Sequence, residues 1–511
     1  MEIRRARTIG VVVLCLASLV AADAGAQAVA DAAKNAEWAA VHQLVETGVD
    51  VAAAQGDGTT ALHWTGYWDA RDIAERLIAA GADVSVANDL GVTPLWTAAE
   101  HGSEPMIALL LAAGANPDAA LPSGETVLMT AARSGSAEGV RRLVASGADV
   151  DARGARGQTA LMWAVAQRHH EVVDALLAGG ADVHARSDVR TEVVKTTPEP
   201  WNPEYVTEIE RGGYTALQFA ARVGDVRSAR LLVAAGADVN DETPSGTSAT
   251  VTAAHSGHGA VAAFLLSRGA NANAAGAGYT ALHTAILHKD EALVASLLTY
   301  GADPNRPIEK STPVRRDAVD FYLHPSWVGA MPFWLAARFS APSIMTVLAE
   351  HGADPLAVHR PTYWPGSLSV RDDRVQVQEG DVTALMAAVG LGGRSPLVAV
   401  DRLDRIAESA PVRSTRREPD PVLREAVTLD AVKRAVGYGI DIHTTNLAGD
   451  TALHAAAASG YASVVSYLVG QGAQLDAVNA NGKTPLDRAT ESRRGDSTVE
   501  LLQRLRTENR R

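Results

Sequence analysis

Histidine is the first residue type to consider for chemistry, because it can bind a metal or move a proton near neutral pH. Three histidines, His63, His283 and His454, each follow the letters Thr-Ala-Leu. Two other groups, His169-His170 and His255-Ser-Gly-His258, come nearest to the spacing of metal ligands. No Asp or Glu stands at zinc-like spacing from them and no HExxH pattern is present, so we expect histidines at helix ends and predict no metal site.

The sequence also gives no sign of a cofactor or of catalysis. Residues 56–61 and 276–281 match a relaxed dinucleotide fingerprint, but both lack the strand and crossover unit that such a site needs, so we predict no cofactor. There is no nucleophile elbow, Walker loop or paired-carboxylate signature, and the one cysteine, Cys15, lies in an apolar stretch near the N-terminus. We therefore predict no catalytic residues and a protein that is not an enzyme.

A repeated segment organises the rest of the chain. Its clearest copy contains Thr93-Pro-Leu-Trp96 and ends at Gly114. The closing glycine recurs every 33 residues from Gly48 to Gly180. A fixed period of this length, with the same short pattern in each copy, indicates stacked units that bury their apolar faces against one another.

Each part of the repeat has a physical role. Thr93 is expected to cap a helix that begins at Pro94, where the missing proline N–H costs nothing. Gly102 is suited to end this helix in a left-handed conformation. Ile107 and Leu110 then lie on the apolar stripe of a second helix.

The repeat resembles that of the ankyrin family. The resemblance rests on Thr60-Ala-Leu-His63, Thr93-Pro-Leu-Trp96, Thr280-Ala-Leu-His283 and Thr451-Ala-Leu-His454, and on closings such as Gly147-Ala-Asp-Val-Asp-Ala152. It covers the chain apart from its first 30 residues and the insertions. It implies an all-α, ankyrin-type solenoid of about twelve helix-turn-helix units with β-turn or hairpin connections. It also implies that the histidine of each box is structural, bonding within and between turns.

Breaks in the period predict the domain organisation. At the ends of the chain we expect a signal peptide at 1–26, a degenerate N-terminal capping repeat at 27–54 and a C-terminal capping repeat at 479–511. Ankyrin repeats are expected at 55–187, 212–306, 329–357, 380–445 and 446–478. Three aromatic insertions separate them, at 188–211, 307–328 and 358–379, and the repeat at 380–445 contains a long inter-helix insertion at 391–421.

The three aromatic insertions all fall at the turn between consecutive units. They carry Trp201, Trp327 and Trp364, each with a tyrosine and a proline nearby. Disordered linkers are usually poor in aromatic residues, so ordered loops are expected. Two interpretations stay open: the rings clamp their own loops onto the solenoid, or they contact a ligand, since Trp and Tyr dominate interface hot spots.

The residues that end each first helix resemble the variable, groove-facing positions of ankyrin proteins. The predicted protein-binding residues are Tyr67, Trp68, Glu100, His101, Arg133, Arg222, His255, His288, Arg338 and Phe339, together with Trp201, Trp327 and Trp364. Arg and His outnumber Glu in this set, although the whole chain has a formal net charge of -13. A locally basic groove would suit an acidic protein segment or an anionic glycan. The alternative is that these are only solvated helix ends.

The N-terminal residues predict export. Arg4, Arg5 and Arg7 precede an uncharged run from Ile9 to Ala22, and Ala24-Gly-Ala26 follows. This order is typical of a secretory signal peptide; the alternative is a retained anchor, for which the run is short. We expect a periplasmic or secreted bacterial protein, a monomer with no membrane insertion after cleavage.

These observations together predict a noncatalytic scaffold that binds proteins through the groove and the edge loops. The acidic surface disfavours nonspecific nucleic-acid binding. Two alternatives remain: a glycan- or peptide-binding protein, possibly enzymatic, that uses the aromatic insertions, and a regulator or inhibitor of an exported enzyme.

Overall fold

The computed structural model describes residues 27–195, 206–311, 323, 325–363, 377–378, 380–392, 421–492 and 496–509. The predicted signal peptide, Trp201 and Trp364 lie outside these residues, as does most of the long inter-helix insertion. The chain divides into two compact units, which are described separately. The N-terminal unit comprises Met1–Asp188 and Gly212–Asp238, and the C-terminal unit comprises Val189–Arg211 and Val239–Arg511.

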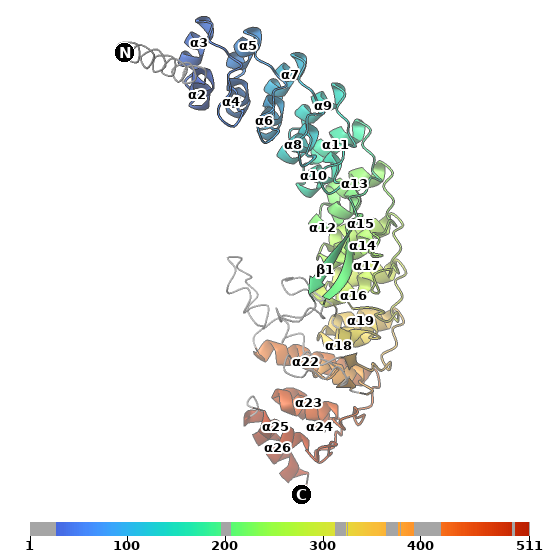
Figure 1. Cartoon of the computed structure of the whole chain (residues 1–511). Coiled ribbons are helices and arrows are strands. Elements are labelled where there is room, and N and C mark those ends of the chain that lie inside the picture. The colour runs from blue at the N-terminus through green and yellow to red at the C-terminus, as the bar shows by residue number, and fades with distance from the viewer. Residues whose placement is uncertain are drawn as a thin grey trace, which may run out of the picture. The chain divides into compact units, whose positions relative to one another are not determined.

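Helices of the N-terminal unit come in pairs. The first helices of the pairs are α2 (Ala28–Lys34), α4 (Ala61–Trp68), α6 (Pro94–Glu100), α8 (Val127–Ser134), α10 (Ala160–Ala166) and α12 (Ala216–Val223). The second helices are α3 (Trp38–Glu46), α5 (Arg71–Ala79), α7 (Glu104–Ala112), α9 (Ala137–Ala145), α11 (His170–Ala178) and α13 (Val226–Ala234). First helices contact the neighbouring first helices and second helices contact the neighbouring second helices, which gives two layers (Figure 1).

The C-terminal unit repeats this plan. Its first helices are α14 (Ala249–His255), α16 (Ala281–His288), α18 (Pro332–Arg338), α20 (Ala384–Ala388), α23 (Ala452–Ser459) and α25 (Pro485–Glu491). Its second helices are α15 (Gly259–Ser267), α17 (Glu291–Thr299), α19 (Pro342–Glu350), α22 (Pro421–Gly437), α24 (Ala462–Gly470) and α26 (Asp496–Glu508). Contacts again run within each layer, from α14 to α25 and from α15 to α26. The predicted all-α, ankyrin-type solenoid is therefore confirmed.

Short strands and one 3-10 turn occur in the insertions. Strands β1 (Arg190–Lys195) and β2 (Val206–Arg211) form an antiparallel hairpin in which Arg190 is paired with Arg211. Strands β3 (Thr362–Tyr363) and β4 (Val377–Gln378) form a second antiparallel pair, and the 3-10 turn η1 spans Pro325–Trp327. Hairpins were predicted for the connections of the solenoid, whereas the aromatic insertions were expected to be ordered loops, so these strand pairs in the insertions are a difference from the prediction.

The helix ends follow the predicted chemistry. Thr93 Oγ1 accepts a hydrogen bond of 3.1 Å from the backbone N–H of Trp96, and Pro94 occupies the first turn of α6. Gly102, just beyond the end of α6, has a φ of 68°. Ile107 and Leu110 are fully buried on α7. Capping, the left-handed glycine and the apolar stripe are thus confirmed in the copy on which they were argued.

Three buried histidines join consecutive turns, as the ankyrin resemblance implied. Nδ1 of His63, His283 and His454 bonds to the threonine three residues earlier, which completes a capping box. The opposite nitrogen bonds to a backbone oxygen of the following turn: Val92 at 2.9 Å, Arg306 at 2.9 Å and Lys483 at 3.2 Å respectively. Burial lowers the pKa of all three imidazoles, and lowers that of His283 to about 4.

An amide ladder links the turns of the C-terminal unit. The Asn273 side chain accepts a hydrogen bond of 2.7 Å from the Asp303 backbone and donates one of 2.8 Å to the Gly301 carbonyl. Asn305 makes the same pair of bonds to Asp354 and Gly352, at 2.8 Å each. Asn305 ends the repeat before the second aromatic insertion and Asp354 ends the repeat after it, so the stack continues across the insertion. None of the helices that the structure describes is both long and apolar enough to cross a membrane.

Candidate protein-binding site

Among the predicted site residues that the structure describes, the most exposed Tyr and Trp side chains lie at the end of α4. Tyr67 and Trp68 are 45% and 48% exposed. The Tyr67 ring makes edge-to-face contacts with Trp64, Trp68 and His101, at centroid distances of 5.8, 4.9 and 4.7 Å. We call these four residues the aromatic cluster. It joins two consecutive first-helix ends, since His101 directly follows α6.

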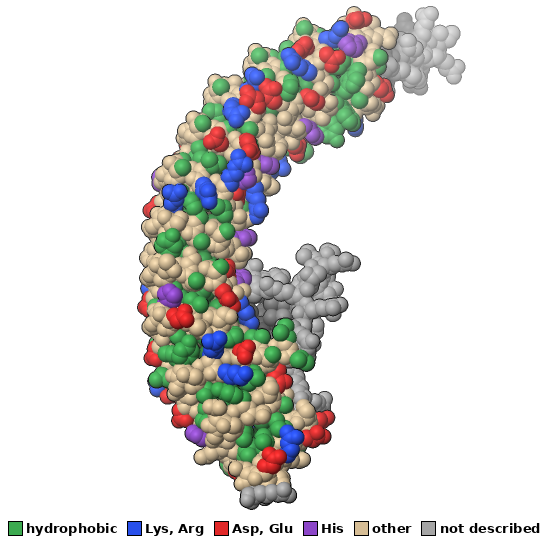
Figure 2. Space-filling view, turned by 180° about the vertical axis from the view of Figure 1, so that it is seen from behind, with side chains coloured by type: hydrophobic (Ala, Val, Ile, Leu, Met, Phe, Trp, Pro, Cys, Tyr) green, Lys and Arg blue, Asp and Glu red, His purple; other side chains and the backbone are tan. Residues whose placement is uncertain are grey.

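Hydrogen bonds fix the orientation of the cluster. Trp68 Nε1 donates to the backbone oxygen of Lys34 at 3.1 Å, and Trp64 Nε1 donates to Gln55 Oε1 at 3.0 Å. The Lys34 ammonium lies 5.7 Å from the centroid of a Trp64 ring. Figure 2 shows hydrophobic side chains gathered near this end of the stack. Rings held in place before binding lose little conformational entropy when a partner arrives.

The charged site residues of the N-terminal unit differ in their surroundings. Glu100 and Arg222 are exposed. Arg133 is only half-exposed and forms an ion pair of 3.3 Å with Glu125. The predicted basic groove is therefore weaker than the residue types indicated, because one of its arginines is already neutralised within its own repeat.

The predicted site residues of the C-terminal unit are more enclosed. His255 and His288 are half-buried, and the His288 Nε2 lies 2.8 Å from the His255 backbone oxygen. Arg338 is 6% exposed, so the expectation that it lies on an accessible surface is wrong. Trp327 is 4% exposed and packs edge to face on the half-buried Phe339, with centroids 5.2 Å apart. Of the two interpretations of the tryptophans, clamping of the loop fits Trp327.

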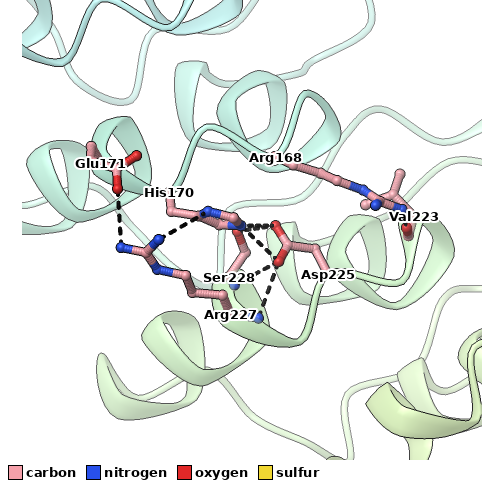
Figure 3. Close-up of polar contacts among 7 residues, drawn as sticks. All are labelled: Arg168, His170, Glu171, Val223, Asp225, Arg227 and Ser228. Carbon is pink, nitrogen blue, oxygen red and sulfur yellow. Dashed lines mark hydrogen bonds and ion pairs between the residues drawn. The ribbon is translucent and has the colours of Figure 1, made fainter.

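A polar cluster that the sequence analysis did not predict joins α11 to α13 (Figure 3). His170 Nε2 lies 3.0 Å from both carboxylate oxygens of Asp225, which also accepts a hydrogen bond of 2.5 Å from the Ser228 hydroxyl. Arg227 contacts His170 Nδ1 at 3.5 Å and forms an ion pair of 3.0 Å with Glu171. A neutral imidazole with its hydrogen on Nε2 satisfies both ring contacts, by donating to Asp225 and accepting from Arg227.

The contacts of the polar cluster are typical of a structural role. Ser228 is fully buried and donates to Asp225 instead of to His170, so its hydroxyl is neither exposed to a substrate nor paired with the imidazole. Burial raises the pKa of the Asp225 carboxyl, but hydrogen bonds from Ser228 and His170 outweigh it and hold that pKa below its ordinary value. Arg168 adds a further bond to the Val223 backbone oxygen. The first insertion thus leaves α11 and α13 directly connected.

The histidine pairs do not converge on a metal site. His169 bonds to the Arg133 backbone oxygen at 3.1 Å, and His170 is held by Asp225. Both lie at the start of α11, as expected of histidines at a helix end, but each is half-buried and bonded to a neighbouring repeat instead of being exposed at the surface. Across the described ranges, no group of three or more His, Cys, Asp or Glu side chains is arranged to hold a metal ion.

Comparisons with known proteins agree with the repeat. A family model described as ankyrin repeats, in three copies, matches residues 28–120, 114–187, 217–308 and 423–509. The chain is 46% identical over 68 residues to protein phosphatase 1 regulatory subunit 27 of Homo sapiens, a stretch that is 13% of this chain and 44% of the relative. It is 31% identical over 141 residues to Rabankyrin-5 of Homo sapiens, which is 27% of this chain and 12% of that protein.

The similarity to these relatives is local, because the chain spans less than half the length of each. The family match is broader and includes more than half of this chain. Paired helices, threonine caps and buried box histidines support it independently. The chain belongs to the ankyrin repeat family.

Proposed function

We propose that the protein is a noncatalytic scaffold that binds a partner protein outside the cytoplasm, with the aromatic cluster at the centre of its binding surface. The observation that carries this proposal is the exposure of Tyr67 and Trp68 on a rigid first-helix end. Buried aromatic anchors supply much of the energy of protein interfaces, and a preformed anchor costs little to order. Glu100 and Arg133 would extend this surface along the next two first-helix ends, those of α6 and α8, and Arg222 would lie further along the same row, on α12.

Export is part of the same proposal. It rests on the positive flank, the short apolar run and the Ala-x-Ala sequence within residues 1–26. Fractionation of the source cells and N-terminal sequencing of the protein test it. A mature chain that begins near Gln27 in the envelope or medium is expected, and an uncut cytoplasmic chain would overturn this part of the proposal.

A second candidate function is regulation of an enzyme. It is favoured by the local similarity to a protein named protein phosphatase 1 regulatory subunit 27. On this view the partner is itself an enzyme, and the scaffold changes its activity by occupying a surface. The glycan-binding alternative has less support, because Trp327, the one described member of its three tryptophans, is buried against Phe339.

A quantitative pull-down from the source cell envelope tests the scaffold proposal. Three baits are compared: the wild-type chain, the Tyr67→Ala/Trp68→Ala variant, and the Tyr300→Ala variant. Tyr300 is a matched control because it is 48% exposed but follows α17, a second-layer helix of the other unit. A protein retained by the wild type and by Tyr300→Ala, and lost from the double variant, is the expected result. Equal retention by all three baits would contradict the site.

The captured protein also separates the two candidate functions. Its catalytic activity is measured with and without the scaffold at saturating concentration. A changed activity supports the regulator, and an active enzyme that is unaffected, or a partner with no activity, supports the plain scaffold.

A further inference from the structure

The aromatic cluster presents ring surface to solvent, with the exposed Asp69 and Glu100 directly beside its members in the chain. Its rings are nearly perpendicular, with interplanar angles of 75°, 85° and 83° around Tyr67. Edge-to-face packing directs the positive ring edge of one residue at the negative face of the next. Tyr67 and Trp68 nevertheless keep nearly half of their surfaces accessible, and a ring whose face is reached by a cation attracts it electrostatically.

The cluster already holds one cation of its own chain. The Lys34 ammonium lies 5.7 Å from a Trp64 ring centroid, within the range of a cation–π interaction. This contact shows that an ammonium group is accommodated at the edge of the cluster. Trp64 is therefore occupied, and the exposed rings of Tyr67 and Trp68 are the ones left for a partner.

Carboxylates border the exposed rings. Asp69 directly follows Trp68, is exposed, and accepts a hydrogen bond from Ser103. Glu100 directly precedes His101 and is also exposed. Tyr67 and Trp68 end α4, and the C-terminal end of a helix carries partial negative charge. The nearest arginine along the row of first-helix ends, Arg133, is paired with Glu125.

We propose that the aromatic cluster receives an arginine or lysine side chain from a basic segment of the partner protein, with the cationic group over Tyr67 and Trp68 and near Glu100. This inference rests on the proposed function and names the chemistry of the partner. The charge that it assigns to the partner is opposite to the one expected from the sequence, in which Arg133, Arg222 and Arg338 indicated an acidic partner. Two of those three arginines are removed from that role, one by an ion pair and one by burial.

Selection from a phage-displayed library of random peptides tests the inference without a known partner. Peptides are selected on the wild-type chain and counter-selected on the Tyr67→Ala/Trp68→Ala variant. The best peptides are then synthesised with arginine and with citrulline, its uncharged isostere, and their Kd values are measured by fluorescence anisotropy. Circular dichroism confirms that each variant keeps the helix content of the wild type, and Tyr300→Ala serves as the control.

The expected peptides are rich in Arg and Lys. Citrulline, or loss of the two rings, should weaken their binding about tenfold or more, and Glu100→Gln should weaken it severalfold. Peptides that depend on Tyr67 and Trp68 but are acidic or lack cations would overturn this inference and leave the proposed site standing. If no selected peptide distinguishes the wild type from the folded double variant, both the inference and the proposed site are wrong.

Discussion

At the scale of single residues, the box histidines tie the stability of the stack to pH. His283 is fully buried, and its pKa of about 4 lies below the ordinary value of 6.5 because burial disfavours the charged ring. As the pH falls from 6.5, the unfolded chain takes up the proton first. The protonation of this one residue therefore leaves the free energy of unfolding at its maximum above pH 6.5 and lowers it towards pH 4, by up to about 3 kcal/mol.

Replacing His283 by Gln should flatten this pH dependence. The chain itself offers the precedent, since Gln218 occupies the same box position and accepts a hydrogen bond of 3.2 Å from Thr215. The melting midpoint, followed from about pH 7 to about pH 4, should fall less in His283→Gln than in the wild type. His351→Gln, at an exposed histidine, is the control. Identical slopes for wild type and His283→Gln would refute this explanation.

Gly147 tests the backbone of the repeat. It has a φ of 92°, and a Cβ added there would meet no atom within 4 Å, so any cost comes from conformation alone. Gly147→Val should destabilise the chain by about 1–2 kcal/mol. The control is Gly470→Val, at a glycine inside α24 that also has nothing within 4 Å but has a helical backbone. Equal melting midpoints for the two variants would count against the left-handed turn.

At the scale of elements, the ladder of Asn side chains holds consecutive repeats together across an insertion. Asn305→Ala removes the bonds to Gly352 and Asp354, and should cost about 1–2 kcal/mol. Hydrogen exchange at the Asp354 amide should accelerate. Asn116→Ala is the control, because the Asn116 side chain bonds to Asp118 within its own turn. Unchanged exchange at Asp354 would show that the ladder does not couple the units.

The polar cluster allows a second test, of the contacts that join α11 to α13. Asp225→Ala removes the cap of α13 and leaves His170 and Ser228 without their shared acceptor, so it should cost about 2–4 kcal/mol. Asp290→Ala, which removes the cap of α17, should cost less. Because the Asp225 pKa is lowered, its contribution is present above about pH 4 and is lost below it. Chemical denaturation at neutral pH measures the free energy of unfolding of both variants, and an equal loss in the two would refute the role of His170.

The sequence predicted the elements better than their contacts. Thr93, Pro94 and the closing glycines act locally, so their pattern alone places helix starts and ends. The burial of Arg338 could not be inferred in this way, nor could the packing of the adjacent Phe339 on Trp327, which comes from the second insertion and not from the repeated pattern. The bond from His170 to Asp225 spans the first insertion and joins residues that no single repeat contains. Contacts of this kind depend on how neighbouring repeats and insertions pack against one another, which the repeated sequence pattern does not specify.

At the scale of the whole molecule, the repeats supply a scaffold and a few positions distinguish it. Most first-helix ends carry small, charged or half-buried residues, whereas the end of α4 carries Tyr67 and Trp68. Phe, Trp and Tyr supply only 5% of the chain, so the two tryptophans that contact Tyr67, beside His101, are a local concentration of aromatic side chains. We therefore expect binding energy to be concentrated there instead of being spread over all the repeats.

The most direct test of this claim is the Kd of the purified partner for three forms of the full chain, measured by isothermal titration calorimetry. We expect Tyr67→Ala/Trp68→Ala to weaken binding at least about tenfold while the melting midpoint stays the same, and Tyr300→Ala to bind as the wild type does. A folded double variant that keeps wild-type affinity would contradict the account, because the binding surface would then lie elsewhere on the solenoid.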